Sequence, residues 1–254
     1  MADFNLKGKI AIITGASSGL GVQFAEALAK EGVKIALVAR RVEKLKQVQE
    51  QISALGVECR YYPTDVASEE QVKNMVENVV KDFGRIDILV NNAGVAACEP
   101  LESHSVASWE KTINIDLNGV FLVTRYVGEV MVKQKYGKIV NIASMYGALA
   151  NKFVPASSYH ASKGAVINFT RAAAAEWAKY NITVNGIGPG FFVSEMTEDL
   201  TKVEAFMNFV KNRCPMERLG NPGELNGALL LLVSDASSYI TGQTIFVDGG
   251  WTAV

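Results

Sequence analysis

The sequence predicts an α/β protein: a single domain over residues 1–254 with a doubly wound, seven-stranded parallel sheet and helices on both faces. Short apolar, β-branched runs alternate with segments of helical periodicity along the whole chain, which is the pattern of a parallel sheet with crossover helices. The length alone would also allow two small domains. No linker, low-complexity tract or internal repeat divides the 254 residues, however.

Each predicted strand is a short run that ends in a glycine, proline or polar turn. The predicted strands are Lys9–Thr14, Val33–Ala39, Glu58–Tyr62, Asp87–Val90, Gly137–Ala143, Ile182–Ile187 and Thr244–Val247. Apolar residues at helical spacing predict the helices Val22–Lys30, Val42–Leu55, Ser68–Phe83, Trp109–Tyr136, Ser157–Tyr180, Ser194–Arg213 and Pro222–Leu232. In such sheets ligands bind beyond the carboxyl ends of the strands, so the loops there are the candidate site.

The first predicted strand ends in a glycine-rich loop and is followed by a helix. This order lets backbone N–H groups approach a phosphate at the helix N-terminus. The G-x-x-x-G-x-G spacing differs from the commonest dinucleotide pattern, and glycine loops also serve as plain turns. Its place directly after the first strand favours a phosphate site, and the candidate contacts are Gly15, Ser17, Ser18, Gly19, Leu20 and Gly21.

The second predicted strand ends in Ala39-Arg40-Arg41, without the carboxylate that many NAD sites use to bind the ribose hydroxyls. Arginine matches a phosphate through a bidentate, charge-assisted contact. These two residues therefore indicate a 2′-phosphate and a preference for NADP(H), with NAD(H) still possible. The alternative is a solvated basic turn that begins the next helix.

Three other strands are followed by loops suited to a ligand crevice. Asp65, with Val66 beside it, could accept a hydrogen bond from an adenine amino group or could cap the next helix. Asn91-Asn92-Ala93-Gly94 follows the fourth strand and Gly188-Pro189-Gly190 the sixth. A structural turn that bridges two strands is the alternative interpretation of Asn91-Asn92-Ala93-Gly94, and both interpretations can hold together.

Tyr159 and Lys163 stand four residues apart on a predicted helix, which places them on one face. A tyrosine hydroxyl ordinarily has a pKa of ~10, and a nearby lysine cation lowers it by favouring the phenolate. The pair can therefore donate and accept a proton. Ser144 follows the fifth strand and could orient a substrate oxygen, while Ser157 or Ser158 is expected to cap the helix. Alone, the Tyr–Lys spacing also suits a half-exposed helix face.

The composition limits the partners and the cellular location. The formal net charge is −1, with the charges scattered, so no nucleic-acid surface is indicated. No secretory signal or membrane-spanning apolar run is apparent. Three well-separated cysteines fit a reducing cytoplasm better than a disulfide framework. The two histidines lack metal-ligand spacing, so no metal site is expected.

Several motifs together resemble the short-chain dehydrogenase/reductase superfamily over essentially the whole chain. They are Thr14-Gly15-x-x-x-Gly19-x-Gly21, Asn91-Asn92-Ala93-Gly94, Ser144, Tyr159-x-x-x-Lys163 and Pro189-Gly190. The resemblance implies a Rossmann fold and a homotetrameric or homodimeric NAD(P)-dependent oxidoreductase. It implies that Tyr159 is the acid and base, that Ser144 holds the substrate oxygen, and that Lys163 lowers the tyrosine pKa and binds the nicotinamide ribose.

The resemblance also assigns the cofactor contacts. Arg40 matches the basic residue of NADP-preferring members, and Asp65 and Val66 match adenine contacts. The residues expected around the nicotinamide and its ribose are Asn92, Ala93, Gly94, Tyr159, Lys163, Pro189, Gly190, Phe192 and Ser194.

The chain departs from the family pattern at three places. Asp116 stands where the family has a catalytic asparagine, which acts largely through its main-chain carbonyl. An aspartate can keep that role, but its charge would oppose the effect of Lys163 on Tyr159. Ser18 replaces a basic residue found in many NADP-dependent members. The Ser144–Tyr159 loop is slightly longer than usual, which bears on specificity.

The predicted substrate is a small carbonyl compound or alcohol. Its candidate walls are Ser144, Tyr146, Phe153, Tyr159, Phe191 and Met196, of which the phenylalanines and the methionine could equally be core packing. Residues 191–214 are expected to form a flap over them. The sequence around Ser144 and Tyr159 is similar to gluconate 5-dehydrogenase-type and sugar or polyol reductases, and hydroxysteroid dehydrogenases and 3-oxoacyl-carrier-protein reductases share much of it. A non-catalytic NADP(H)-binding sensor is the alternative of another class.

Overall fold

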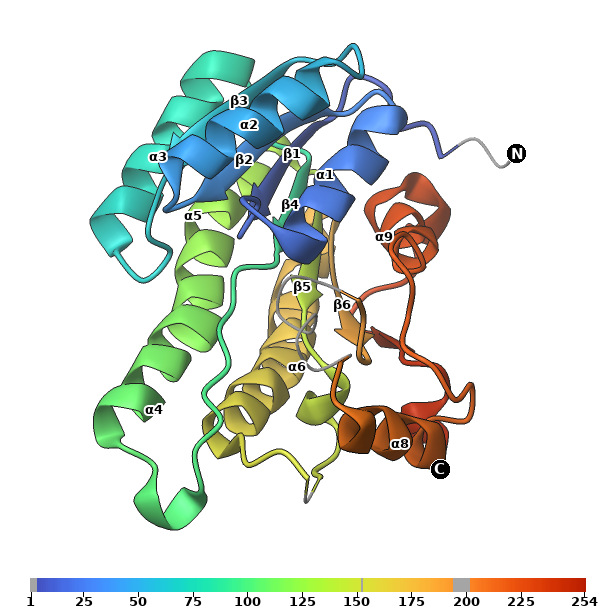
Figure 1. The fold of residues 1–254 in the computed structure, drawn as a ribbon. Coiled ribbons are helices and arrows are strands. Elements are labelled where there is room, and N and C mark those ends of the chain that lie inside the picture. Colours follow the sequence, from blue (N-terminus) through green and yellow to red (C-terminus); the bar gives the residue numbers. More distant parts are fainter. Residues whose placement is uncertain (1–3, 152, 194–201) are drawn as a thin grey trace.

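The computed structural model describes residues 4–151, 153–193 and 202–254. In this part of the chain the strands form one seven-stranded sheet in the order β3-β2-β1-β4-β5-β6-β7 (Figure 1). Every neighbouring pair is parallel. The strands are β1 Ile10–Thr14, β2 Lys34–Ala39, β3 Cys59–Pro63, β4 Ile88–Asn91, β5 Gly137–Ile142, β6 Ile182–Pro189 and β7 Thr244–Val247. The predicted fold class is confirmed.

Two hydrophobic clusters, one on each face of the sheet, account for most of the core. The first packs α1 (Gly19–Lys30), α2 (Val42–Ser53) and α9 (Asn226–Val233) against the strands. The second packs α3 (Glu69–Phe83), α5 (Gly119–Gln134) and α6 (Ser157–Trp177). Helices therefore cover both faces, as expected of a doubly wound sheet (Figure 1).

The segment predicted to be mostly one long helix, Trp109–Tyr136, is helical as far as Gln134 but contains a π-helical turn. The structure has α4 (Val106–Ile113), a π-helical turn η2 (Asn114–Asn118) and then α5. Ser105 caps α4 by accepting a 3.2 Å hydrogen bond from the N–H of Ser108. The π turn inserts an extra residue per turn, which a helical apolar pattern does not reveal.

Other helix ends also differ from their predicted positions. Neither Ser157 nor Ser158 caps α6: Ala156 is the N-cap, and neither buried hydroxyl has a hydrogen-bond partner in the part of the chain that the structure describes. The helix predicted over Pro222–Leu232 is α9, which begins later, because the residues before it form turns. Of the predicted helix Ser194–Arg213, the described part is α8 (Glu204–Arg213); residues 194–201 lie outside the described residues.

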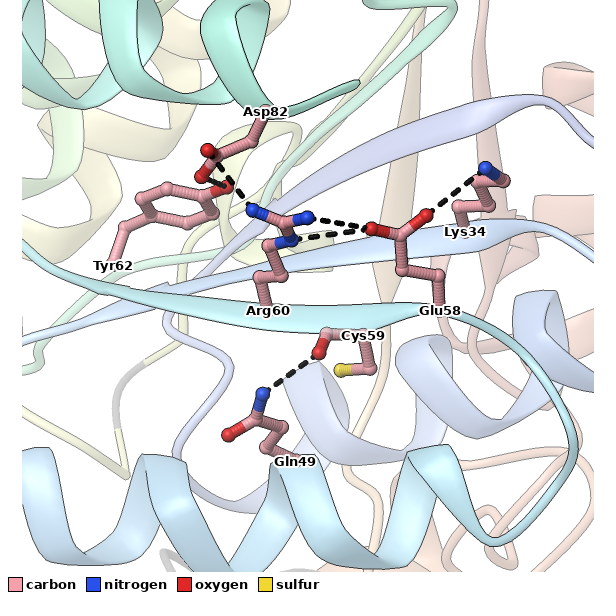
Figure 2. A network of polar contacts seen from close by, with 7 residues as sticks. All are labelled: Lys34, Gln49, Glu58, Cys59, Arg60, Tyr62 and Asp82. Atoms are coloured by element: carbon pink, nitrogen blue, oxygen red, sulfur yellow. Dashed lines mark hydrogen bonds and ion pairs between the residues drawn. The ribbon is translucent and has the colours of Figure 1, made fainter.

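A network of ion pairs runs along β3, one of the two outer strands of the sheet (Figure 2). Arg60 pairs with Glu58 at 3.0 Å and with Asp82 of α3 at 2.9 Å. Glu58 also pairs with Lys34 of β2 at 3.0 Å. Each exposed pair contributes at most about 1 kcal/mol, but charged side chains along an outer strand oppose pairing with another chain.

Within the described residues, no helix combines the length and apolar character needed to cross a membrane.

Helices α5 and α6 approach closely at Gly128, and this contact gives a testable prediction. A Cβ atom on Gly128 would overlap the Trp177 ring. We expect Gly128→Ala to lower the free energy of unfolding by about 1–3 kcal/mol, because the ring must shift out of a packed site. Urea unfolding followed by circular dichroism measures this change.

Gly227→Ala in α9 is the matched control, since a Cβ there meets no atom within 4 Å. It should leave stability unchanged or raise it by up to about 1 kcal/mol, the gain in helix propensity. Equal stability of Gly128→Ala and wild type would contradict the tight contact.

Candidate active site

A cavity of about 700 Å³ opens at the carboxyl edge of the sheet. Loops that follow β1 to β6 form its walls, as expected for a doubly wound sheet. The sequence-predicted site residues that line it are Gly15, Ser17, Ser18, Gly19, Leu20, Arg40, Arg41, Asp65, Val66, Asn92, Ala93, Gly94, Ser144, Tyr146, Tyr159, Lys163, Pro189, Gly190, Phe191 and Phe192.

The glycine loop leaves the start of α1 open toward the cavity. Gly15 has a φ of +67°, and a Cβ on it would lie 2.8 Å from the Cα of Ala93, so the turn requires glycine. Ser18 is the N-cap of α1, yet its side chain makes no capping hydrogen bond. The first N–H groups of a helix are unpaired and carry partial positive charge. This arrangement fits the phosphates of a dinucleotide.

Gly21 does not line the cavity. It lies behind the loop, where a Cβ would overlap the carbonyl oxygen of Gly15. Its role is therefore to let α1 approach the end of β1 closely.

Hydrogen bonds join the ends of β1 and β4 beneath the cavity. Thr14 Oγ1 accepts from the N–H groups of Asn92, at 2.9 Å, and Ala93, at 3.0 Å. The Asn92 side chain donates back to the Thr14 carbonyl at 3.0 Å. Asn92 thus holds the two loops together.

Arg41 lies against the glycine loop and Arg40 does not. The Arg41 guanidinium donates to Ser17 Oγ at 3.0 and 3.1 Å and to Ser18 Oγ at 2.5 Å. Arg40 is exposed, and its Nη1 atom lies 3.9 Å from the Asp65 carboxylate. A cation beside two hydroxyls and a helix N-terminus suits a phosphate group.

Asp65 lies in the turn before α3 but does not cap that helix. Its carboxylate accepts from the N–H of Ala67 at 3.1 Å. Ser68 is the N-cap of α3 and accepts from the N–H of Gln71 at 3.4 Å.

Ser144, Tyr159 and Lys163 meet at the other end of the cavity. The Lys163 ammonium donates to the carbonyl of Ile142 at 3.0 Å and lies 5.5 Å from the centroid of the Tyr159 ring. Ser144 Oγ accepts a 3.1 Å hydrogen bond from the N–H of Tyr146. This leaves the Ser144 proton available to a substrate oxygen, so the three groups suit proton transfer.

Asp116 contacts Lys163 and not the cavity. It lies in the π-helical turn η2 with no exposed surface. One carboxylate oxygen accepts from the N–H of Val95 at 2.8 Å, and the other lies 3.6 Å from Lys163 Nζ. Burial raises the pKa of Asp116, and the Lys163 cation opposes that rise. The Asp116 carboxylate therefore lies within ion-pair distance of the Lys163 ammonium, as the sequence led us to expect.

Some residues of the substrate wall differ from those the sequence suggests. Phe153 does not line the cavity, because its ring stacks on Phe209 of α8 with centroids 4.5 Å apart. Ser194 and Met196 lie outside the described residues. Cys98, Val154 and Ala156 line the wall. The sequence analysis did not select these three residues, and the only signal for them in the sequence is their position in loops that follow strands.

Comparisons with known proteins agree with this geometry. A family model described as enoyl-(acyl carrier protein) reductase matches residues 15–252. The gluconate 5-dehydrogenase of Gluconobacter oxydans is 39% identical over 98% of this chain and 96% of its own length. The 3-oxoacyl-[acyl-carrier-protein] reductase of Thermotoga maritima is 40% identical over 96% of this chain and 98% of its own.

A solved structure shares the fold closely. The gluconate 5-dehydrogenase from Burkholderia cenocepacia, in complex with NADP and tartrate, superposes with a TM-score of 0.95. It is 37% identical, and the match covers 99% of this chain and 98% of that one.

The buried Asp116 predicts a specific dependence of stability on pH. Its pKa is raised in the folded state, so the native protein binds more protons than the unfolded chain just above the ordinary aspartate range. The stability that Asp116 contributes is present at low pH and is lost as the pH rises through its folded pKa. The difference between the free energy of unfolding of the wild type and that of Asp116→Asn should therefore fall as the pH rises from the ordinary aspartate pKa to the raised pKa of Asp116 in the folded protein.

Urea unfolding at a series of pH values from ~4 to ~8 measures this difference, over the range that contains ordinary and raised aspartate pKa values. Glu102→Gln, at an exposed carboxyl in the 3₁₀ turn Leu101–Ser103 shortly before α4, is the control and should show no such trend. A pH-independent difference for Asp116→Asn would contradict the raised pKa.

Proposed function

Because the chain belongs to the short-chain dehydrogenase/reductase family, we propose that this oxidoreductase uses NADP(H) to interconvert a ketone and a secondary alcohol. One observation carries the proposal. Ser144, Tyr159 and Lys163 line the same cavity as the open N-terminus of α1 and the Arg41 guanidinium. The groups that can donate a proton and the groups that suit a phosphate thus line the same cavity.

The residues of the chain can supply the acid–base part of the reaction. NADP(H), when bound, supplies or accepts the hydride. In reduction, Tyr159 donates a proton to the carbonyl oxygen and Ser144 donates a hydrogen bond to it, which stabilises the charge that develops there. Lys163 stabilises the resulting phenolate and can bind the nicotinamide ribose. In oxidation, the phenolate takes the proton back.

Arg41 supports the preference for NADP(H). Its contacts with Ser17 and Ser18 hold it over the glycine loop, where a 2′-phosphate could replace the serine hydroxyls as its acceptor. Arg40 keeps its proposed role toward the 2′-phosphate, and Asp65 and Val66 keep theirs toward the adenine. NAD(H) could bind the same cavity without the Arg41 contact.

We place the substrate first among keto sugars and sugar acids, because gluconate 5-dehydrogenases are among the relatives. Hydroxysteroids and 3-oxoacyl thioesters are the alternatives. Residues 191–214 are proposed as a lid: Phe191 and Phe192 line the cavity, and Phe206 of α8 packs edge-on against Phe191 at 5.0 Å. Ser194 and Met196 keep their proposed roles toward the nicotinamide and substrate.

We also propose a cytoplasmic homotetramer or homodimer. Trp109 of α4 and Phe121 of α5 are exposed, as a subunit interface would explain. Cys59, Cys98 and Cys214 are free thiols, which suits a reducing compartment. Light scattering after gel filtration would test the assembly.

Substituting Tyr159 tests the chemistry. Tyr159→Phe should lower turnover by about 10²- to 10⁴-fold, the usual contribution of a positioned proton donor, and leave NADPH binding intact. The measurements are NADPH fluorescence on binding and NADPH consumption with keto sugars, keto acids, steroid ketones and 3-oxoacyl thioesters.

Wild-type turnover by Tyr159→Phe would refute the assignment. Tight NADPH binding by the wild type with no turnover on any ketone would instead favour a non-catalytic sensor, in which the Asp116 charge beside Lys163 suppresses proton transfer.

Substituting Arg41 tests the cofactor preference. Arg41→Gln should weaken NADPH binding by about 10- to 100-fold, the loss expected for a charged hydrogen-bond donor, and should hardly change NADH binding. Arg40→Gln is the control and should have a smaller effect. Equal losses for both cofactors would mean that Arg41 only stabilises the loop.

A further inference from the structure

Tyr146 is held rigidly in the cavity wall, two residues after Ser144. It belongs to the short 3₁₀ turn Met145–Gly147 and is 7% exposed. Its ring stacks on His160 with centroids 4.6 Å apart and meets the edge of Phe191 at 5.9 Å. Its N–H donates to Ser144 Oγ, so its position is coupled to that of Ser144.

The hydroxyl of Tyr146 is buried and has no hydrogen-bond partner among the described residues. Burial raises its pKa, an effect that the neighbouring Asn151 side chain reduces, so the group remains a protonated donor. The Asn151 side chain approaches the hydroxyl oxygen as a donor, so it is the hydroxyl proton that lacks an acceptor among the described residues. Unpaired buried polar groups are unfavourable and rare in folded proteins. One of them in the wall of a substrate cavity indicates a ligand oxygen.

Apart from Ser144, Tyr159 and the His160 ring stacked on it, the residues around Tyr146 are apolar. Met145, Val154, Ala156 and Phe191 line this end of the cavity. Three cations stand among the described residues that line the cavity. Arg40 and Arg41 lie at the glycine-loop end, and the Lys163 ammonium already contacts the Asp116 carboxylate and the Ile142 carbonyl. A carboxylate here would be desolvated without a cation to pair with, which is strongly unfavourable.

We propose that the Tyr146 hydroxyl binds a second oxygen of the substrate, away from the reacting carbonyl, and that the substrate is uncharged at that position. Tyr146 is thus a specificity-determining residue. The proposal rests on the proposed function, because it places the reacting carbonyl at Tyr159 and Ser144. Among the proposed substrates it favours hydroxylated ketones, keto sugars included, that are uncharged at the position that meets Tyr146.

Ketones that share one ring and differ in one substituent test the proposal. The probes are cyclohexanone, its 3- and 4-hydroxy derivatives and 4-oxocyclohexanecarboxylate, each assayed with NADPH. For the wild type, kcat/KM for at least one hydroxy derivative should exceed that for cyclohexanone and for the carboxylate by about tenfold, the discrimination of one hydrogen bond.

Tyr146→Phe should reduce this advantage to within about twofold and leave kcat/KM for cyclohexanone almost unchanged, because it removes only the hydroxyl. The loss should appear mainly in KM. Tyr239→Phe, on a fully exposed side chain, is the matched control and should keep the wild-type preference.

Equal losses for all ketones in Tyr146→Phe would show a structural role, and no change would show no contact; either overturns the proposal. A wild-type preference for the carboxylate, or NADPH binding without reduction of any hydroxy derivative, also overturns it, and neither result depends on a variant. Failure to bind NADPH would instead refute the proposed function on which the inference rests.

Discussion

The buried Lys163 ammonium is the group on which the arrangement of the site depends. A cation removed from water must be compensated by fixed partners, and here these are the Ile142 carbonyl at 3.0 Å and the Asp116 carboxylate at 3.6 Å. They come from β5 and from the π-helical turn before α5. One side chain of α6 therefore sets the position of two other elements; Tyr159 lies on α6 itself, and Ser144 follows the end of β5.

A chain of buried side-chain hydrogen bonds supports the same elements. Asn91 of β4 donates to Thr124 of α5 at 2.8 Å and to Asn141 of β5 at 2.9 Å. Asn141 donates in turn to Thr170 of α6 at 2.9 Å. Because these amides would be unfavourable unpaired in the core, they select one placement of α5 and α6 on the sheet. This fixes Tyr159 and Lys163 relative to the strand ends.

The two ends of the cavity are chemically different. The glycine-loop end has Arg41, the open start of α1 and two serine hydroxyls, which together suit a phosphate-bearing cofactor. The end near Tyr146 is apolar apart from Ser144, Tyr159 and the Tyr146 hydroxyl. Relatives that share the scaffold can therefore act on different substrates, since the scaffold holds the cofactor while loop residues form the substrate wall.

The sequence by itself determined the features that depend on short-range patterns. The strand–helix alternation, the glycine loop after β1 and the four-residue spacing of Tyr159 and Lys163 could all be predicted, because each reflects local backbone geometry. The family motifs extended this to most of the residues that line the cavity. Helix ends were less predictable: the N-cap of α6 is Ala156 and not a serine.

Only the tertiary structure decided which distant side chains meet. It decided that Asp116, in a π turn hidden within an apolar helical pattern, reaches Lys163, and that Arg41, not Arg40, covers the glycine loop. It also decided that Phe153 turns toward α8 while Tyr146 presents an unpaired hydroxyl. Each of these contacts joins elements separated in the chain, and packing, charge pairing and desolvation select them rather than any local pattern.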